Sequence, residues 1–211
     1  MTRARVALAC AAGTLSLAFR AVPAHAGDWS IGGRAGSEWM FLEGDVSTSD
    51  LRGFVFGVDA AYSVGRRMAL GADLDASIYT QRSDRLPPGP TADSFATFLE
   101  LRIDTNPEGP FSARIDLGTG YRFLMLPLAS GPTDRFGAWE ALRLRVGPAW
   151  RASSGVQVAV VAGFGFGWFA SRGRDGACAV IGTCSDSLYD SDAQSPVHFV
   201  SELALTVRGW P

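Results

Sequence analysis

The sequence predicts an all-β chain that forms an eight-stranded, antiparallel, up-and-down transmembrane β-barrel. Three observations support this fold class: apolar and polar residues alternate along eight stretches, the stretches are long, and their connections alternate between long and short. A period of two is the pattern of a β-strand with one apolar and one polar face, and it excludes an amphipathic helix. A strand that crosses a bilayer at a tilt of about 45° needs about 9 to 11 residues. The stretches reach this length.

Residues 111–123 show the pattern most clearly. One face is apolar over the whole stretch: Phe111, Ala113, Ile115, Leu117, Thr119, Tyr121 and Phe123. The other face holds small and charged residues: Ser112, Arg114, Asp116, Gly118, Gly120 and Arg122. We therefore take this stretch as the fifth of the eight predicted strands.

The first four strands are expected at 29–41, 53–64, 68–79 and 94–104. Their apolar faces include Trp29, Ile31, Trp39 and Phe41, then Phe54, Phe56 and Val58, then Leu70, Leu74 and Ile78, then Phe95, Leu99 and Ile103. Glycines, aspartates, glutamates and arginines occupy most of the alternate positions. Each of these stretches therefore has the two faces of a bilayer-spanning strand.

The last three strands are expected at 136–150, 156–168 and 197–210. Their apolar faces include Leu142, Leu144, Val146 and Trp150, then Val156, Val160 and Phe164, then Phe199, Leu203 and Leu205. Glu140 is a misfit, because it falls on the apolar face of its strand. A bulge near Ala141 would move it to the other face.

The connections alternate in length along the chain. Long loops are expected at 42–52, 81–93, 124–135 and 172–195, and short turns separate the remaining strands. Outer-membrane barrels have short periplasmic turns and longer extracellular loops. The alternation therefore predicts that both ends of the barrel domain lie on the periplasmic side.

The size of the barrel decides which face lies inside. Eight strands leave an interior only just wide enough for side chains or one small ligand, and the many large apolar residues would not fit there. The glycines lie almost entirely on the polar face, where an inner wall is crowded. Aromatic residues of the apolar face gather near the strand ends, as in the two interfacial girdles of a membrane barrel. They are Trp29, Tyr62, Phe111 and Trp150 toward the turns, and Trp39, Phe54, Phe95, Phe123, Phe136 and Trp168 toward the loops.

The N-terminal residues read as an export signal. Arg3 and Arg5 precede an apolar segment, and Ala24-His25-Ala26 is a small-residue cleavage site, so residues 1–26 are predicted to be removed and 27–211 to form one barrel domain. Without Arg3, Arg5 and Arg20 the basic residues fall from 19 to 16 against 21 acids. A chain near −5 is not expected to bind nucleic acid. The predicted location is the cell outer membrane.

The polar face predicts a lumen filled by ion pairs. The charged residues that the alternation places inside are Arg34, Glu38, Asp59, Asp73, Asp75, Glu100, Arg102, Asp104, Arg114, Asp116, Arg122, Arg143, Arg145, Glu202 and Arg208. Buried charges need partners, and the strands 94–104 and 111–123 could pair Arg102 with Asp116 and Glu100 with Arg114. We therefore expect a solid lumen and a poor pore.

Three further residue groups contain residue types that can carry chemistry. Cys178 and Cys184 in an exported chain predict a disulfide in the longest loop, whereas Cys10 is expected to leave with the signal. Asp186, Asp190 and Asp192 could bind calcium, but their spacing fits a solvated acidic loop better. His198, Ser201 and Glu202 could suggest a lipid hydrolase, but Ser201 falls on the opposite face from the other two. The sequence thus predicts no metal, no cofactor and no enzyme activity.

The cleaved signal, the eight amphipathic strands, the alternating connections and a strand reaching the C-terminus resemble the small eight-stranded outer-membrane barrels of the OmpA transmembrane domain and OmpX type. The resemblance covers the whole mature chain but is architectural. It implies a structural or surface-interaction role, with outer-membrane lipid and the barrel-assembly machinery as partners, and an extracellular partner that would bind through the four long loops. Trp210-Pro211 departs from the outward aromatic with which such barrels end. The alternatives are a small ligand-binding or weakly conducting barrel and, third, the lipid-modifying hydrolase.

Overall fold

The structure, a computed structural model, describes residues 28–43, 49–82, 91–127, 133–174 and 197–210. The predicted signal segment, the cysteine pair and the acidic residues near 186–192 lie outside these ranges. The described residues form eight strands: β1 (Trp29–Glu43), β2 (Ser49–Ser63), β3 (Met68–Arg82), β4 (Ala92–Asp104), β5 (Phe111–Pro127), β6 (Thr133–Ser153), β7 (Val156–Arg174) and β8 (Val197–Gly209). No helix among the described residues is long and apolar enough to cross a membrane.

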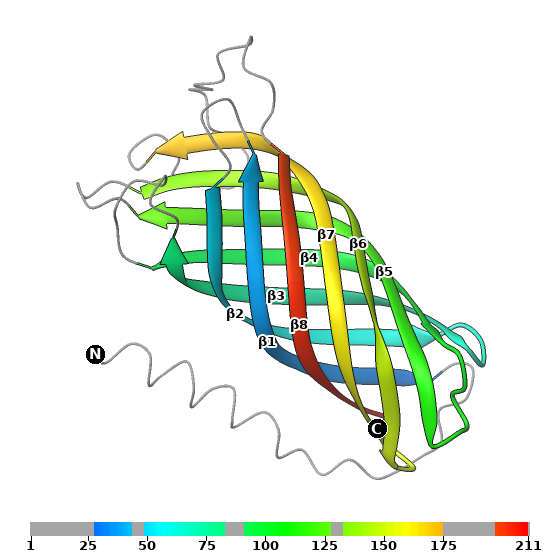
Figure 1. Cartoon of the computed structure of the whole chain (residues 1–211). Coiled ribbons are helices and arrows are strands. Elements are labelled where there is room, and N and C mark those ends of the chain that lie inside the picture. Colours follow the sequence, from blue (N-terminus) through cyan, green and yellow to red (C-terminus); the bar gives the residue numbers. More distant parts are fainter. Residues whose placement is uncertain (1–27, 44–48, 83–90, 128–132, 175–196, 211) are drawn as a thin grey trace.

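The strands close into a barrel (Figure 1). Each strand pairs antiparallel with its neighbour in the chain, and β1 closes the sheet by pairing with β8 from Ile31↔Gly209 to Glu43↔Val197. Closure leaves no unpaired sheet edge. The predicted fold class is confirmed. We call the end that holds the connections 64–67, 105–110 and 154–155 the turn end, and the opposite end the loop end.

The strands are longer at the loop end than the alternation predicts. Most of the expected loop 124–135 is strand, because β5 continues to Pro127 and pairs with a β6 that begins at Thr133. Leu124, Met125 and Leu126 are all apolar, so the alternation ends there while the strand does not. Leu124 and Leu126 are buried and face the lumen, which is apolar at this level.

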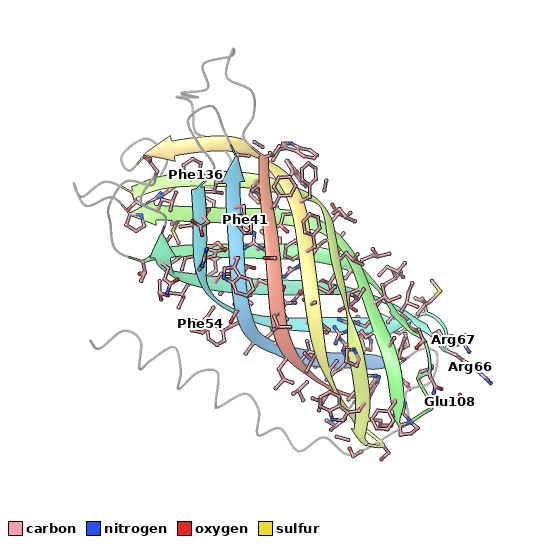
Figure 2. All side chains as sticks on the ribbon, viewed as in Figure 1. Phe41, Phe54, Arg66, Arg67, Glu108 and Phe136 are labelled. Atoms are coloured by element: carbon pink, nitrogen blue, oxygen red, sulfur yellow. The ribbon has the colours of Figure 1, made fainter. Side chains whose placement is uncertain are left out.

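The two faces of the barrel are inverted relative to a water-soluble protein. Leu99, Leu74 and Phe111 on the outer face are 70%, 58% and 74% exposed, and Figure 2 shows Phe54 projecting from the outside of β2. Most charged residues of the strands lie within. A soluble monomer rarely exposes so continuous an apolar surface, whereas an outer-membrane barrel carries an outward apolar band.

One extra residue in β6 resets the faces of that strand. Gly118 and Gly120 of β5 lie opposite Arg143 and Glu140, so Ala141 and Leu142 face the single residue Thr119. The β7 side shows the same shift between Glu140 and Leu142. This is a β-bulge at the position that the sequence suggested, and it turns Glu140 inward.

Because of the bulge, two aromatic residues lie on the opposite face from the one predicted. Phe136 was expected in the outer girdle, but it packs against the apolar cluster inside the loop end. Trp139 has the parity of the inward Arg143 and Arg145, which predicts an inner face, but it is 51% exposed, and its ring meets that of Tyr121 edge-on at 5.4 Å. Both differ from the prediction because residues before a bulge have the opposite parity to those after it.

Candidate functional site

The lumen is the candidate functional site, because it gathers the polar and charged side chains of all eight strands. Along the barrel axis they form three layers. The upper layer, toward the loop end, consists of Glu38, Tyr79, Ser94, Arg122, Glu140 and His198. The central layer consists of Arg34, Asp73, Asp75, Phe98, Glu100, Arg143, Arg145 and Glu202. The lower layer, toward the turn end, consists of Asp59, Arg102, Arg114, Asp116, Thr206 and Arg208.

In the upper layer, one guanidinium joins several strands. Arg122 on β5 lies 3.0 Å from Glu38 on β1, donates to Ser94 on β4 at 2.9 Å, and binds Glu140 on β6. The Tyr79 hydroxyl also donates to Glu38. The side chains of Arg122, Glu38 and Glu140 are fully buried. This layer therefore ties together strands from opposite sides of the barrel.

His198 on β8 belongs to the upper layer, near the loop end of its strand. Its side chain is fully buried, with Nε2 3.6 Å from Glu140 Oε1 and its ring 5.0 Å from that of Phe169. Among the described residues, neither ring nitrogen has a hydrogen-bond partner. Ser201 falls on the other face of β8, so the strand does not bring this hydroxyl and the imidazole together.

The central layer is a network of bifurcated ion pairs. Arg34 on β1 contacts Asp73 at 2.9 Å and Glu202 at 2.8 Å, and it also binds Asp75. Arg143 on β6 contacts the same Glu202 at 2.7 Å and the same Asp75. Each carboxylate is therefore shared by two guanidiniums, an arrangement that suits the planar fork of arginine.

Two further side chains complete the central layer. Arg145 on β6 contacts Asp73 at 2.8 Å and also binds Glu100 on β4. The guanidinium of Arg143 lies over the ring of Phe98, 4.1 Å from its centroid, which is the geometry of a cation–π contact. Space for these groups comes from inner-face glycines, since a Cβ on Gly57 would overlap the Asp75 carboxylate and lie 3.1 Å from Arg34 Nη2.

In the lower layer, three arginines share two carboxylates. Asp59 accepts from Arg102 at 3.0 Å and from Arg208 at 3.2 Å. Asp116 accepts from Arg102 at 3.1 Å and from Arg114 at 2.9 Å, and Arg114 also donates to Thr206 at 3.0 Å. The upper and central layers hold more carboxylates than arginines, and the lower layer holds fewer. The charge of the lumen therefore changes along the barrel axis, from net negative toward the loop end to net positive toward the turn end.

An apolar cluster lies at the loop end next to the upper layer, and Tyr79 belongs to both. Its buried members are Met40, Leu51, Tyr79, Ala92, Leu124, Leu126, Ala138, Phe169 and Val200, with Leu42 and Phe136 packed against them. Sequence reasoning missed this cluster, because it assigned several of these positions to loops. The only available signal was the apolar run 124–126.

The charged residues predicted from the sequence lie as follows. All of them except Asp104 are buried in the three layers. Asp104 is half-buried near the turn end, where it accepts a hydrogen bond from Gln157 at 2.7 Å. Arg102 and Asp116 form the expected pair, but Glu100 and Arg114 do not, because Glu100 lies opposite Gly118 in the register and binds Arg145 instead.

Polar residues of the lumen that the sequence did not single out include Tyr79, Ser94, Gln157 and Thr206. Their alternation with outward residues was the available signal. Among the described residues, no group of three or more histidines, cysteines, aspartates or glutamates is arranged to hold a metal ion.

Several solved structures are similar to this barrel, and three of them are described below. Neisserial surface protein A aligns with a TM-score of 0.53 at 11% identity, over 85% of this chain and 96% of that one. The outer membrane protein OprG from Pseudomonas aeruginosa gives 0.51 at 12%, over 88% and 97%. The outer membrane protein AlkL, solved in lipid bilayers, gives 0.52 at 13%, over 91% and 93%.

This chain has the fold of the small outer-membrane barrels. No family model and no curated protein sequence matches it, so the likeness is one of architecture, as the sequence predicted. An outer-membrane location agrees with this fold and with the exposed apolar belt.

Proposed function

We propose that the protein is an integral outer-membrane barrel whose lumen is closed, and that its role is structural or one of surface interaction through its long loops. The observation that carries this proposal is the lumen itself. Ion pairs fill it in three successive layers, and the apolar cluster adds a fourth at the loop end. An eight-stranded barrel has an interior that side chains can fill, and this one contains bulky, mutually bonded residues throughout.

The charge pairing supports a structural role over a transport role. A conducting lumen keeps some charged groups solvated, whereas the central guanidiniums and carboxylates contact each other and have side chains only 1–3% exposed. Removing one partner of such a buried pair typically destabilises a protein by about 3 to 5 kcal/mol, because the remaining charge is left unpaired. The network therefore fixes the shape of the barrel.

Surface interaction is assigned to the loop end. In outer-membrane barrels the longer connections face outward, and the strand ends that lead into the connections between β1 and β2, β3 and β4, β5 and β6, and β7 and β8 lie at this end. A rigid barrel below them would hold these loops at the cell surface.

Two experiments test the proposal. Fractionation of cells that express the chain should recover it in the detergent-extracted outer membrane, and recovery as a soluble periplasmic protein would contradict membrane integration. Proteoliposomes that contain the purified protein should not swell in an isotonic pentose solution, while a large porin in the same lipid should cause swelling. Swelling at the rate of the porin would contradict a closed lumen.

A further inference from the structure

The turn end holds a cavity that lies between the lower layer of the lumen network and the turns. It measures about 60 Å³, where one water molecule needs roughly 10 to 15 Å³ of such volume. Its lining includes six arginines and one carboxylate among the described residues: Arg66, Arg67, Arg102, Arg114, Arg151, Arg208 and Asp104. Trp210 also lines it, and β8 ends immediately before this residue. The cavity is therefore strongly cationic.

Its inner wall is the lower layer of the lumen, which carries an excess of positive charge. Asp59 and Asp116 together neutralise two of the three guanidiniums of Arg102, Arg114 and Arg208. The next acid along the axis, Glu100, has an oxygen 3.7 Å from Arg102 Nη2 but binds Arg145 more closely. A buried charge without a full partner is costly, so this wall favours an anion.

Two donors in the same wall have no acceptor. Arg102 Nη1 and Arg208 Nε are buried and make no hydrogen bond within the described residues, although their side chains are only 7% and 4% exposed. An unsatisfied buried donor on a charged group carries a full desolvation penalty. An oxyanion in the cavity would supply both acceptor atoms and negative charge.

The outer wall adds cations that do not take part in the lumen ion pairs. Arg66 and Arg67 project from the exposed turn between β2 and β3, as Figure 2 shows. Arg151 on β6 donates to the carbonyl of Pro107 and so attaches the turn between β4 and β5 to the rim. The single lining carboxylate, Asp104, accepts a hydrogen bond from the neutral Gln157 and offsets only one of the six positive charges in the lining.

We propose that this cavity binds a phosphate-type oxyanion, either free phosphate or the phosphate of a lipid headgroup. The arginine fork matches the oxygen spacing of phosphate, and a doubly charged group would offset the excess charge of the inner wall together with that of the rim. The volume accommodates several water-sized groups, which suffices for one tetrahedral anion. Because the turn end is the periplasmic end in outer-membrane barrels, both sources would reach it from the periplasm or the inner leaflet.

The test uses the purified full mature chain in a neutral detergent. Sodium phosphate is titrated calorimetrically against a sodium chloride control of equal ionic strength. Arg208→Gln should weaken phosphate binding about tenfold, the effect of losing one charge-assisted hydrogen bond. The rim double variant Arg66→Gln/Arg67→Gln leaves the lumen pairs intact and should weaken it about threefold. Arg52→Gln is the matched control, because Arg52 lies at the loop end with its side chain 55% exposed.

A second arm separates the two sources. The same proteins are placed in nanodiscs of phosphatidylcholine with a minor fraction of phosphatidylglycerol, and retention of the anionic lipid is measured by mass spectrometry. Saturable binding of inorganic phosphate that the cavity variants weaken supports a site for the free anion. Absence of phosphate binding with loss of phosphatidylglycerol retention in those variants supports a headgroup site. If neither phosphate binding nor selective lipid retention is found, or if Arg52→Gln has the same effects as the cavity variants, the proposal is overturned. If Arg208→Gln does not fold, the rim double variant alone decides between these outcomes.

Discussion

The guanidinium of Arg122 binds the carboxylate of Glu140 inside the barrel, and it does so because the bulge at Ala141 turns Glu140 away from the lipid. Without the extra residue, the alternation of β6 would place this carboxylate in the bilayer. The bulge thus allows one strand to contribute Glu140 to the upper layer and Arg143 to the central layer, although three positions separate them.

This pair gives the first prediction. Glu140→Ala leaves Arg122 with Glu38 as its remaining described carboxylate partner, so the free energy of unfolding should fall by about 3 to 5 kcal/mol. Reversible urea unfolding in lipid vesicles measures the change. Asp50→Ala is the control, because Asp50 pairs with Arg52 at the exposed loop end, and it should shift the free energy by less than about 1 kcal/mol. Equal effects would mean that Glu140 is not buried against Arg122.

The second prediction concerns the outer face. Val160 faces outward on β7, between the turn end and the outward Trp168, and is 39% exposed, so we expect it to contact lipid within the apolar band. Val160→Arg should reduce the free energy of unfolding by about 2 to 4 kcal/mol. Val64→Arg, in the exposed turn between β2 and β3, should change it by no more than about 0.5 kcal/mol. A neutral Val160→Arg in the same vesicle assay would place this face elsewhere.

The third prediction compares two glycines on opposite faces. A Cβ on Gly147 would overlap the carbonyl oxygen of Val160, whereas the nearest atom to a Cβ on Gly33 is 3.9 Å away. Gly147→Ala should therefore destabilise the barrel by about 1 to 3 kcal/mol through overpacking, and Gly33→Ala should have little effect. Thermal unfolding followed by circular dichroism compares them. Equal melting temperatures of the two variants would show that the inner wall has space for a Cβ at Gly147, which would contradict the prediction.

Much of this architecture could be predicted from the sequence, because the residues of the two faces of a strand occupy alternate positions along the chain. The positions of Arg114, Asp116 and Arg122 relative to the lumen follow from parity alone. The end of β5 could not be predicted, because the alternation stops before the strand does. Leu124 to Leu126 are apolar on both faces, and this segment was expected to be a loop.

Ion-pair partners were less predictable than faces. Arg102 and Asp116 lie directly opposite each other on adjacent strands, so their pairing could be foreseen. Glu100 binds Arg145 from a strand that is not its neighbour, and such a contact depends on barrel diameter and side-chain reach. The cavity at the turn end was missed for the same reason, since its arginines come from turns and from several strands that meet only on closure.

The central claim, that the lumen is closed, is tested most directly by single-channel recording in planar bilayers. The purified wild-type protein should show little or no steady conductance, because three layers of ion pairs and the apolar cluster occupy the lumen. Arg143→Ala, which leaves Asp75 and Glu202 each without one of their two guanidiniums, should introduce leak events or destabilise the barrel, while Arg52→Gln should behave as the wild type. Steady nanosiemens-scale conductance from the wild-type protein would contradict the closed lumen and favour transport.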